Sequence, residues 1–269
     1  MNLIGATSLG WGHAPLDRIF AELHLIGGQC IELNGRPGQH DGLTITGSKV
    51  DLVLSWAANS EITISSVAGY NDFAQTDPKE LDREVESLLQ ACGLASELGV
   101  SIVRAFAGEP KTGTTLATMW PRIIEGFRHA APSAESMGVT LAIENHGHLV
   151  NDGILLARLI EEIGSPHVRL NLDTGNFSWA GHELDRTWRD FEAALPYAVN
   201  VHIKDVTWDD SDPRFVAAGT GDLNLDRLLL LLRHRDYQGA ILSEYEGALP
   251  HLQGTQQSIT YLLESQSTN

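Results

Sequence analysis

Short apolar runs with strand character recur eight times along this chain, and a segment of helical pattern follows each run. The runs lie at about residues 2–7, 29–34, 61–67, 100–107, 139–145, 168–174, 198–206 and 239–245. Strands that alternate with helices predict a parallel sheet. Eight such units in 269 residues favour an α/β chain that closes into a single (β/α)8 TIM barrel, one domain over residues 1–269. An open doubly wound sheet is the alternative, but no GxGxxG motif follows the first strand.

Residues 77–98 show the helical pattern most clearly. Apolar residues recur at spacings of three and four along one stripe, from Leu81 to Ala95. Asp77 and Pro78 are typical of a helix start, and Gly99 is typical of a helix end. Near the other end of the chain, Gly219-Thr-Gly-Asp222 predicts a turn that leads into a helix over 224–233.

The charge balance bears on the class of partner. The chain has 35 acidic and 18 basic residues, a net charge of −17. Such a surface repels phosphate backbones, which counts against DNA or RNA as a ligand. No apolar run approaches the roughly 20 residues that cross a bilayer, and no secretion-signal pattern stands at the N-terminus. We expect a soluble, cytoplasmic protein in which Cys30 and Cys92 are small core residues without a disulfide.

Four polar residues stand near the ends of four successive strand-like runs. They are Glu144, Asp173, His202 and Glu244, at intervals of 29, 29 and 42 residues. Because each gap accommodates a helix and its loops, we expect the four side chains to converge at one mouth of the barrel. Three carboxylates would repel one another there without a cation. The set therefore predicts a site for one divalent metal ion, with positions left open for a substrate.

Residues two positions beyond three of these candidates share their face of the strand, because side chains alternate along a strand. His146, Lys204 and Glu246 are therefore predicted to form an outer ring that can touch a substrate. Asn171 and Asn200 precede their metal-ligand candidates by two residues, and they are candidates for hydrogen bonds to the ligands.

An arginine and several loop aromatic residues could serve either the site or the fold. We interpret Arg104 as a structural partner of Glu32 or Glu144 rather than as a catalyst. Aromatic side chains in loops after the first and sixth strands could wall a sugar site or simply pack on the surface, and these are Trp11, His13, Trp179 and His182.

Four motifs resemble those of the xylose-isomerase-like TIM barrels, in particular the sugar epimerase/isomerase and inosose dehydratase branch. The motifs are Ile143-Glu-Asn-His146, Leu172-Asp-Thr-Gly175, Val201-His-Ile-Lys-Asp205 and Leu242-Ser-Glu-Tyr-Glu246. The resemblance implies that Glu144, Asp173, His202 and Glu244 bind one metal ion, usually manganese, with cobalt, magnesium or zinc as variants. It also implies that Glu144 and Glu244 act as an acid/base pair on opposite faces of the substrate carbon.

The chain departs from that family's pattern at two positions. Epimerases of the family commonly have a substrate-binding histidine where Asn176 stands, and a substrate glutamate where Val150 stands. Asn176 is expected to contact the substrate, although the ketose contacts of the best-known epimerases are not reproduced. The three-metal pattern of endonuclease IV is also missing, which agrees with the acidic charge in excluding DNA repair.

The predicted function is a metal-dependent isomerase or epimerase of a small sugar or keto-polyol in carbohydrate metabolism. A lyase or dehydratase that uses His146 for β-elimination on a keto-sugar, 3-keto-glycoside or keto-inositol is the alternative. A non-catalytic sugar-binding protein is the third hypothesis. The resemblance is compatible with a homo-oligomer, and no nucleic-acid or membrane partner is expected.

Overall fold

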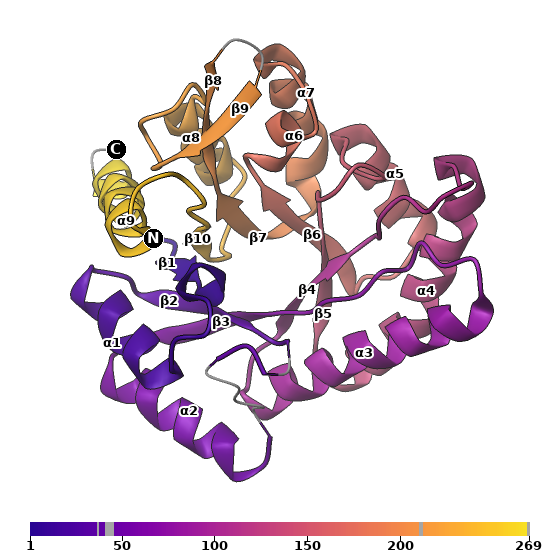
Figure 1. Cartoon of the computed structure of the whole chain (residues 1–269), viewed down its shortest axis with the longest axis horizontal. Coiled ribbons are helices and arrows are strands. Elements are labelled where there is room, and N and C mark those ends of the chain that lie inside the picture. The colour runs from indigo at the N-terminus through magenta and orange to yellow at the C-terminus, as the bar shows by residue number, and fades with distance from the viewer. Residues whose placement is uncertain (37, 41–45, 210–211, 268–269) are drawn as a thin grey trace.

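Parallel strands form a closed barrel at the centre of the computed structural model, which describes residues 1–36, 38–40, 46–209 and 212–267 (Figure 1). Around the barrel the order is β1-β10-β7-β6-β5-β4-β3-β2, which confirms the predicted (β/α)8 TIM barrel and rules out the open sheet. The barrel strands are, in chain order, β1 (Ile4–Thr7), β2 (Cys30–Asn34), β3 (Thr63–Ala68), β4 (Ile102–Phe106), β5 (Thr140–Glu144), β6 (Val168–Asp173), β7 (Ala198–Ile203) and β10 (Ile241–Ser243).

Helices surround the barrel and connect its strands (Figure 1). They are α1 (Leu16–Leu25), α2 (Ser48–Asn59), α3 (Pro78–Glu97), α4 (Leu116–Ser136), α5 (Gly153–Ile163), α7 (Leu184–Ala194), α8 (Leu225–His234) and α9 (His251–Ser267). Shorter elements are α6 (Asn176–Trp179) and the 3₁₀ segments η1 (Ser8–Trp11) and η2 (Leu195–Tyr197).

Local capping sets the ends of α3 as the sequence predicts. The Asp77 side chain accepts a hydrogen bond from the Lys79 backbone N–H at 2.9 Å, and Pro78 is the first helical residue. Gly99, which follows the helix, has a φ of 70°, a left-handed value that glycine adopts without a Cβ clash. The predicted turn at 219–222 is also present, and α8 begins close behind it at Leu225.

The predicted strand over 198–206 is wrong at its end. Strand β7 stops at Ile203, and the chain then forms an antiparallel hairpin of β8 (Asp205–Asp209) and β9 (Asp212–Val216). The buried carboxylate of Asp205 accepts backbone hydrogen bonds from Gly219 and Gly221, at 2.9 Å each. These bonds tie the start of the hairpin to the turn before α8, a long-range contact that strand periodicity does not reveal.

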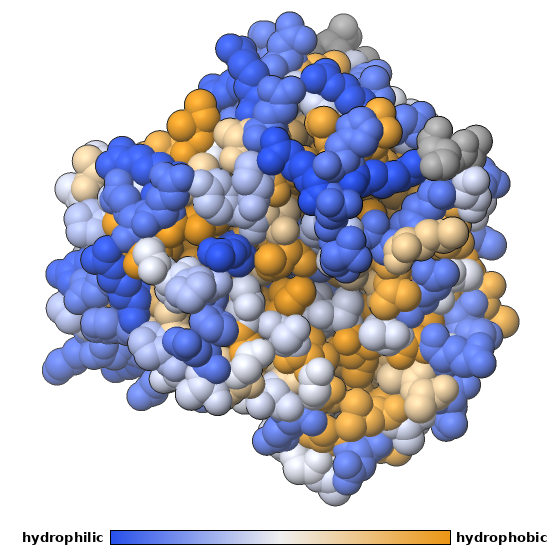
Figure 2. Space-filling model, turned by 180° about the vertical axis from the view of Figure 1, so that it is seen from behind, coloured by the Kyte–Doolittle hydropathy of each residue, from blue (hydrophilic) through white to orange (hydrophobic). Residues whose placement is uncertain are grey.

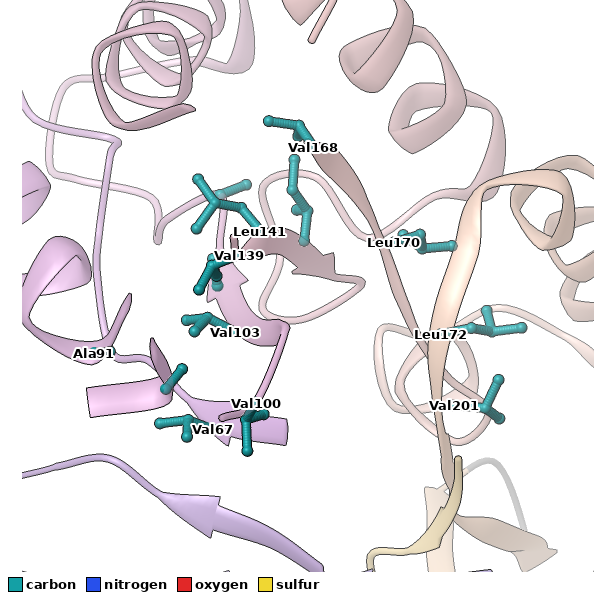
Figure 3. Close-up of a cluster of buried hydrophobic side chains, with 14 of the residues drawn as sticks. Val67, Ala91, Val100, Val103, Val139, Leu141, Val168, Leu170, Leu172 and Val201 are labelled. Atoms are coloured by element: carbon teal, nitrogen blue, oxygen red, sulfur yellow. The ribbon is translucent and has the colours of Figure 1, made fainter. Parts of the chain in front are cut away.

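Apolar residues fill the space between the barrel and its helices. Strand residues of one parity are buried and hydrophobic, and Figure 3 shows Val103, Leu141, Leu170, Leu172 and Val201 among them. Residues of the other parity face the barrel interior and become polar toward the strand ends. The two cysteines are free and buried, as expected.

Strand register brings the carboxyl ends of β4 to β10 to one rim. Phe106 lies opposite Glu144, and Asp173 lies opposite His202. A register shift between Leu170 and Asn171 precedes the second pairing. The active sites of TIM barrels lie at this end of the strands, so the register positions the site.

The surface mixes hydrophilic and hydrophobic residues. Seen from behind, hydrophobic residues gather toward the lower right of the molecule (Figure 2). Large exposed apolar side chains include Leu25 of α1 and Leu52 and Leu54 of α2. Among the described residues, no helix has both the length and the apolar character needed to cross a membrane. A possible homo-oligomeric assembly and a cytoplasmic location stay predictions.

Candidate metal centre and substrate cavity

The four predicted metal ligands meet at the carboxyl end of the barrel. Glu144 ends β5, Asp173 ends β6, His202 lies on β7, and Glu244 directly follows β10. One potential ligand atom from each residue lies within 4.8 Å of those from the other three, and all four residues are buried. Residues that are up to 100 positions apart in the sequence are thus brought together by the closure of the barrel.

His202 and Lys204 bridge the carboxylates of the cluster. His202 Nδ1 lies 3.0 Å from Glu144 Oε1 and 3.2 Å from Glu244 Oε2. Lys204 Nζ lies 3.1 Å from Glu244 Oε2, 3.3 Å from Asp173 Oδ2 and 3.5 Å from Glu246 Oε2. The alternation argument correctly placed Lys204 on the same face as His202.

A layer of polar side chains below the cluster orients it. Asn171 Nδ2 donates to Glu144 Oε1 at 2.7 Å, as the parity of β6 predicted. Asn200 Nδ2 lies 2.7 Å from Asn171 Oδ1 and 3.1 Å from Glu32 Oε2. His202 Nε2 lies 3.2 Å from the same Glu32 oxygen. Glu32, from β2, therefore orients the far side of the histidine ring.

Arg104 has the structural role that the sequence indicated. Its Nη1 donates to Glu144 Oε2 at 3.0 Å, and its Nε lies 3.7 Å from Glu32 Oε1. The guanidinium carbon also lies 4.2 Å from the ring centre of Phe106 and 4.9 Å from that of Tyr70. The Arg104 guanidinium group thus pairs with both Glu144 and Glu32, and it packs against two aromatic rings.

These contacts move the pKa values of the cluster in opposite directions. Burial alone would raise the pKa of Glu144, but the charge of Arg104 and the hydrogen bond from His202 lower it to about 2. Burial raises the pKa of Asp173 well above its usual range, since attraction to Lys204 only partly opposes burial and the Glu244 and Glu144 charges add to it. Additional positive charge beside Asp173 would favour its ionised form.

The residues present fit a divalent cation. Asp173 Oδ1 accepts hydrogen bonds from the backbone of Gly175 and Asn176, at 2.9 and 3.0 Å. Asp173 Oδ2 is buried, and it has no hydrogen-bond donor among the described residues, although Lys204 Nζ lies near it. A cation would satisfy this oxygen and neutralise the carboxylates. Three carboxylates and one imidazole are suitable ligands for such an ion.

A cavity of about 340 Å³ opens above the cluster. Glu144, Glu244, His146, Lys204 and Glu246 all contribute to its lining, so the predicted outer ring faces the cavity. Sequence reasoning missed other lining residues near the ends of β1, β3 and β4, and these are Leu9, Tyr70, Asn71, Phe106 and Glu109. Their positions just after strand-like runs were the available signal, but they belong to no recognised motif.

The His146 ring stands at the cavity wall between aromatic rings. Its centre lies 4.7 Å from that of Phe106 and 6.0 Å from that of Trp179, and the His148 ring stacks on Trp179 at 4.5 Å. Trp179 thus joins an aromatic row that includes a cavity-lining histidine. His182 is buried against Asp190, with Nδ1 2.7 Å from Oδ2.

The other aromatic candidates have structural contacts. Trp11 Nε1 donates to Glu22 Oε2 at 2.8 Å, and His13 Nδ1 lies 2.8 Å from the Gln39 carbonyl oxygen. Neither Trp11 nor His13 lines the cavity above the metal cluster. The structure therefore separates Trp179 from the other loop aromatics.

Asn176 lies one layer behind the cavity. Its side chain is buried, Oδ1 lies 3.4 Å from Lys204 Nζ, and Nδ2 has no partner among the described residues. Asn176 is not part of the lining of the cavity above the cluster. Its predicted contact with substrate stays a prediction, and in this structure it supports Lys204 and Asp173.

Comparison with known proteins identifies the family. The profile of the family described as "Xylose isomerase-like TIM barrel" matches residues 20–265. The chain therefore belongs to the xylose isomerase-like TIM barrel family, as the four motifs indicated.

Characterised relatives include an epimerase and an isomerase. The chain is 30% identical over 214 residues to a 2-epi-5-epi-valiolone 7-phosphate 2-epimerase of Actinoplanes sp., covering 77% of this chain and 74% of the relative. It is 24% identical over 170 residues to the hydroxypyruvate isomerase of Escherichia coli strain K12, covering 60% and 61%. A solved structure of 3-keto-D-glucoside 4-epimerase from E. coli has the same fold, with a TM-score of 0.80, 16% identity, and coverage of 98% and 100%.

Proposed function

We propose that the protein is a divalent-metal-dependent isomerase or epimerase of a small sugar or keto-polyol. The observation that carries the proposal is the convergence of four buried side chains, Glu144, Asp173, His202 and Glu244, beside a cavity that Glu144 and Glu244 line. The Actinoplanes epimerase and the E. coli isomerase support this class of reaction.

The same four side chains would hold the metal ion, with manganese expected and magnesium, cobalt or zinc as alternatives. When bound, such an ion supplies Lewis-acid stabilisation of the negative charge that develops on substrate oxygens. The chain itself must bind the substrate, orient it and move the proton.

Epimerisation and isomerisation both begin with removal of a proton from a carbon beside a carbonyl. A glutamate carboxylate takes the proton, and the electron pair of the C–H bond forms the enediolate. Return of a proton to the opposite face of that carbon gives the epimer, and return to the neighbouring carbon gives the isomer. Glu144 and Glu244 are the proposed acid/base pair.

The two glutamates share a lowered pKa but differ in their partners. Both oxygens of Glu144 accept hydrogen bonds, from Arg104 and from Asn171, and its pKa is about 2. Glu244 contacts His202 and Lys204 through Oε2. Burial opposes ionisation of Glu244, but the charges of Lys204 and His202 hold its pKa well below its usual value as well. We therefore propose that one of the two glutamates removes the substrate proton and that the other returns it.

Lys204 and Glu246 are proposed to bind substrate oxygens. Both line the cavity, and Lys204 lies at hydrogen-bond distance from Glu244, so its ammonium group can stabilise charge beside the reacting carbon. Glu246 is half-exposed at the rim, where a carboxylate suits sugar hydroxyl donors. Asn176 would act from behind through Lys204.

A lyase that acts by β-elimination is the second candidate. Its supporting observation is the His146 ring, which faces the cavity and is partly exposed. In this reaction the imidazole would remove the α-proton, and the C–O bond at the β-carbon would break to release hydroxide or an alkoxide. A 3-keto-glycoside or a keto-inositol would suit this chemistry.

Proton exchange followed by NMR in D₂O tests the proposal. The manganese-loaded protein is incubated with ketoses, 3-keto-glycosides and keto-inositols. Deuterium beside the carbonyl with all oxygens retained supports an isomerase or epimerase, whereas loss of water or of an aglycone supports the lyase.

Two variants discriminate between these candidates. Glu244→Gln should lower the exchange rate by about 100-fold or more, the usual range for loss of an acid/base residue. His146→Ala should retain most exchange in an epimerase. The reverse order would favour the lyase, and small equal losses would contradict both assignments.

A further inference from the structure

Three carboxylates outside the metal cluster line the cavity, and these are Asp72, which pairs with Lys111, and the two glutamates Glu109 and Glu246. Glu109 follows β4, and Glu246 follows β10. Both side chains line the cavity, and they are 48% and 40% exposed, so both carboxyl groups are accessible to a substrate.

The backbone on which Glu109 stands is held in a defined place. The Glu109 backbone N–H donates to Asp72 Oδ1 at 3.2 Å, and the other Asp72 oxygen pairs with Lys111. Gly108 has a φ of 126°, and a Cβ there would lie only 2.3 Å from Asp72 Oδ1. The close approach of Asp72 therefore requires glycine at position 108.

The Glu109 carboxylate is also seated against the β5 loop. A Cβ on Gly147 would lie 2.2 Å from Glu109 Oε1, so only glycine allows the carboxylate to approach this backbone. His146 Nδ1 lies 3.5 Å from the same oxygen. Because its backbone and its carboxylate are both restrained, Glu109 is a built part of the cavity wall.

The cations of the cavity are already engaged. Lys204 is buried among Asp173, Glu244 and Glu246, and Arg104 is buried against Glu32 and Glu144. In the part of the chain that the structure describes, they are the lysine and arginine residues that line this cavity. No lysine, arginine or histidine occurs at positions 37, 41–45, 210–211 or 268–269.

A third cation, Lys111, pairs with Asp72 at the cavity wall, and a fourth lies in a neighbouring cavity. Arg36 lines a space of about 700 Å³ that shares Tyr70 and Phe106 with the substrate cavity, and its guanidinium carbon is 5.8 Å from the Tyr70 ring centre. Glu84 and Glu97 line that space as well. Acidic groups thus accompany the accessible arginine there too.

We propose that Glu109, together with Glu246, makes the cavity select a keto-sugar or keto-glycoside that carries no negative charge remote from the metal. A phosphate or carboxylate at that end of a substrate would face Glu109 and Glu246, while the nearby cations Lys204 and Lys111 already pair with carboxylates, so like charges would be brought together. This inference rests on the proposed function. It predicts a substrate that differs from the phosphate ester in the name of the Actinoplanes relative.

The experiment compares a neutral ketose with the same ketose carrying a remote phosphate, D-fructose and D-fructose 6-phosphate. Deuterium exchange gives kcat/KM for each compound with the manganese-loaded enzyme, and calorimetry gives the Kd of each independently of turnover. The wild-type protein should favour fructose by about tenfold or more, and Glu109→Lys should shift the ratio toward the phosphate by about tenfold. Glu109→Gln should produce a smaller shift in the same direction.

Glu135→Lys is the matched control. Glu135 is 60% exposed near the end of α4 and does not line the cavity. Glu135→Lys changes the net charge by the same amount as Glu109→Lys, and it should leave the ratio of the two substrates unchanged. If the wild type uses fructose 6-phosphate as well as or better than fructose, the inference is overturned. If the Arg36→Ala variant then loses this preference for the phosphate, the phosphate binds in the neighbouring cavity. A ratio that Glu109→Lys does not move also overturns it.

The two proposals can fail separately. Exchange with the phosphate but not with fructose leaves the proposed chemistry intact and refutes the selectivity. If neither compound exchanges, the proposed function fails on this pair, and the ratio of Kd values then decides the selectivity. Binding of neither compound by the manganese-loaded protein counts against the selectivity as well.

Discussion

Replacement of Arg104 by methionine should destabilise the folded protein strongly. Arg104, Glu32 and Glu144 are all at least 95% buried, and the substitution leaves two carboxylates without their cation. At 3.0 Å and an effective dielectric constant of about 20, the attraction between Arg104 and Glu144 is roughly 5 kcal/mol. Part of this is offset because methionine is cheaper to bury than a guanidinium group. We expect the free energy of unfolding to fall by about 3–5 kcal/mol at pH 7.

The loss should depend on pH with a definite sign. Burial opposes ionisation of Glu144, but Arg104 and His202 hold its folded-state pKa near 2, below the ordinary value of 4.5. A depressed pKa contributes stability that is present above pH 4.5 and is lost as the pH falls toward 2. The difference between wild type and Arg104→Met should therefore be largest near neutrality and shrink between pH 4.5 and 2.

Urea unfolding followed by circular dichroism measures this difference, and Arg227→Met is the matched control. Arg227 also combines an ion pair, to Glu192 at 3.2 Å, with an aromatic contact, 4.1 Å above Trp188, but it is half-exposed. Its loss should cost less than about 1 kcal/mol. Equal effects of the two substitutions at pH 7 would refute the reasoning from burial.

Four further predictions concern the metal site and two glycines. Asp173→Asn should weaken manganese binding more than about tenfold in calorimetry, since even indirect partners of metal ligands contribute about 10–100-fold. The affinity of the wild-type protein for manganese should rise with pH, because the pKa values of Asp173 and His202 are raised and both groups must lose a proton to bind metal. A manganese affinity that does not depend on pH would contradict this. Gly93→Ala in α3 meets no atom within 4 Å and should stabilise the protein by about 0.5–1 kcal/mol in urea unfolding. Gly175→Ala should destabilise it by about 1–3 kcal/mol, because the new Cβ would lie 2.6 Å from Lys204 Cβ; a gain in stability would show that the site relaxes freely.

The order of strands and helices could be predicted from the sequence because it depends on local periodicity. Short apolar runs mark the eight strands, and apolar stripes at spacings of three and four mark helices between them. Capping residues such as Asp77 and Gly99 mark the ends of α3. The metal-site candidates were also accessible, since Glu144, Asp173 and His202 occupy equivalent positions at strand ends. Side-chain alternation was then enough to place His146 and Lys204 on the cavity side.

Other features depended on the closed barrel. Glu109 and Tyr70 became cavity residues only because β3 and β4 end beside β5, and no local pattern distinguishes them from loop residues. The hairpin after Ile203 depends on bonds from Asp205 to the turn before α8, which is distant in sequence. The sequence by itself determined the order of the barrel strands and their helices and the residue types at the strand ends. Only the tertiary structure decided which charges face one another, because separations of a few ångströms between distant residues set the pKa values and the selectivity of the cavity.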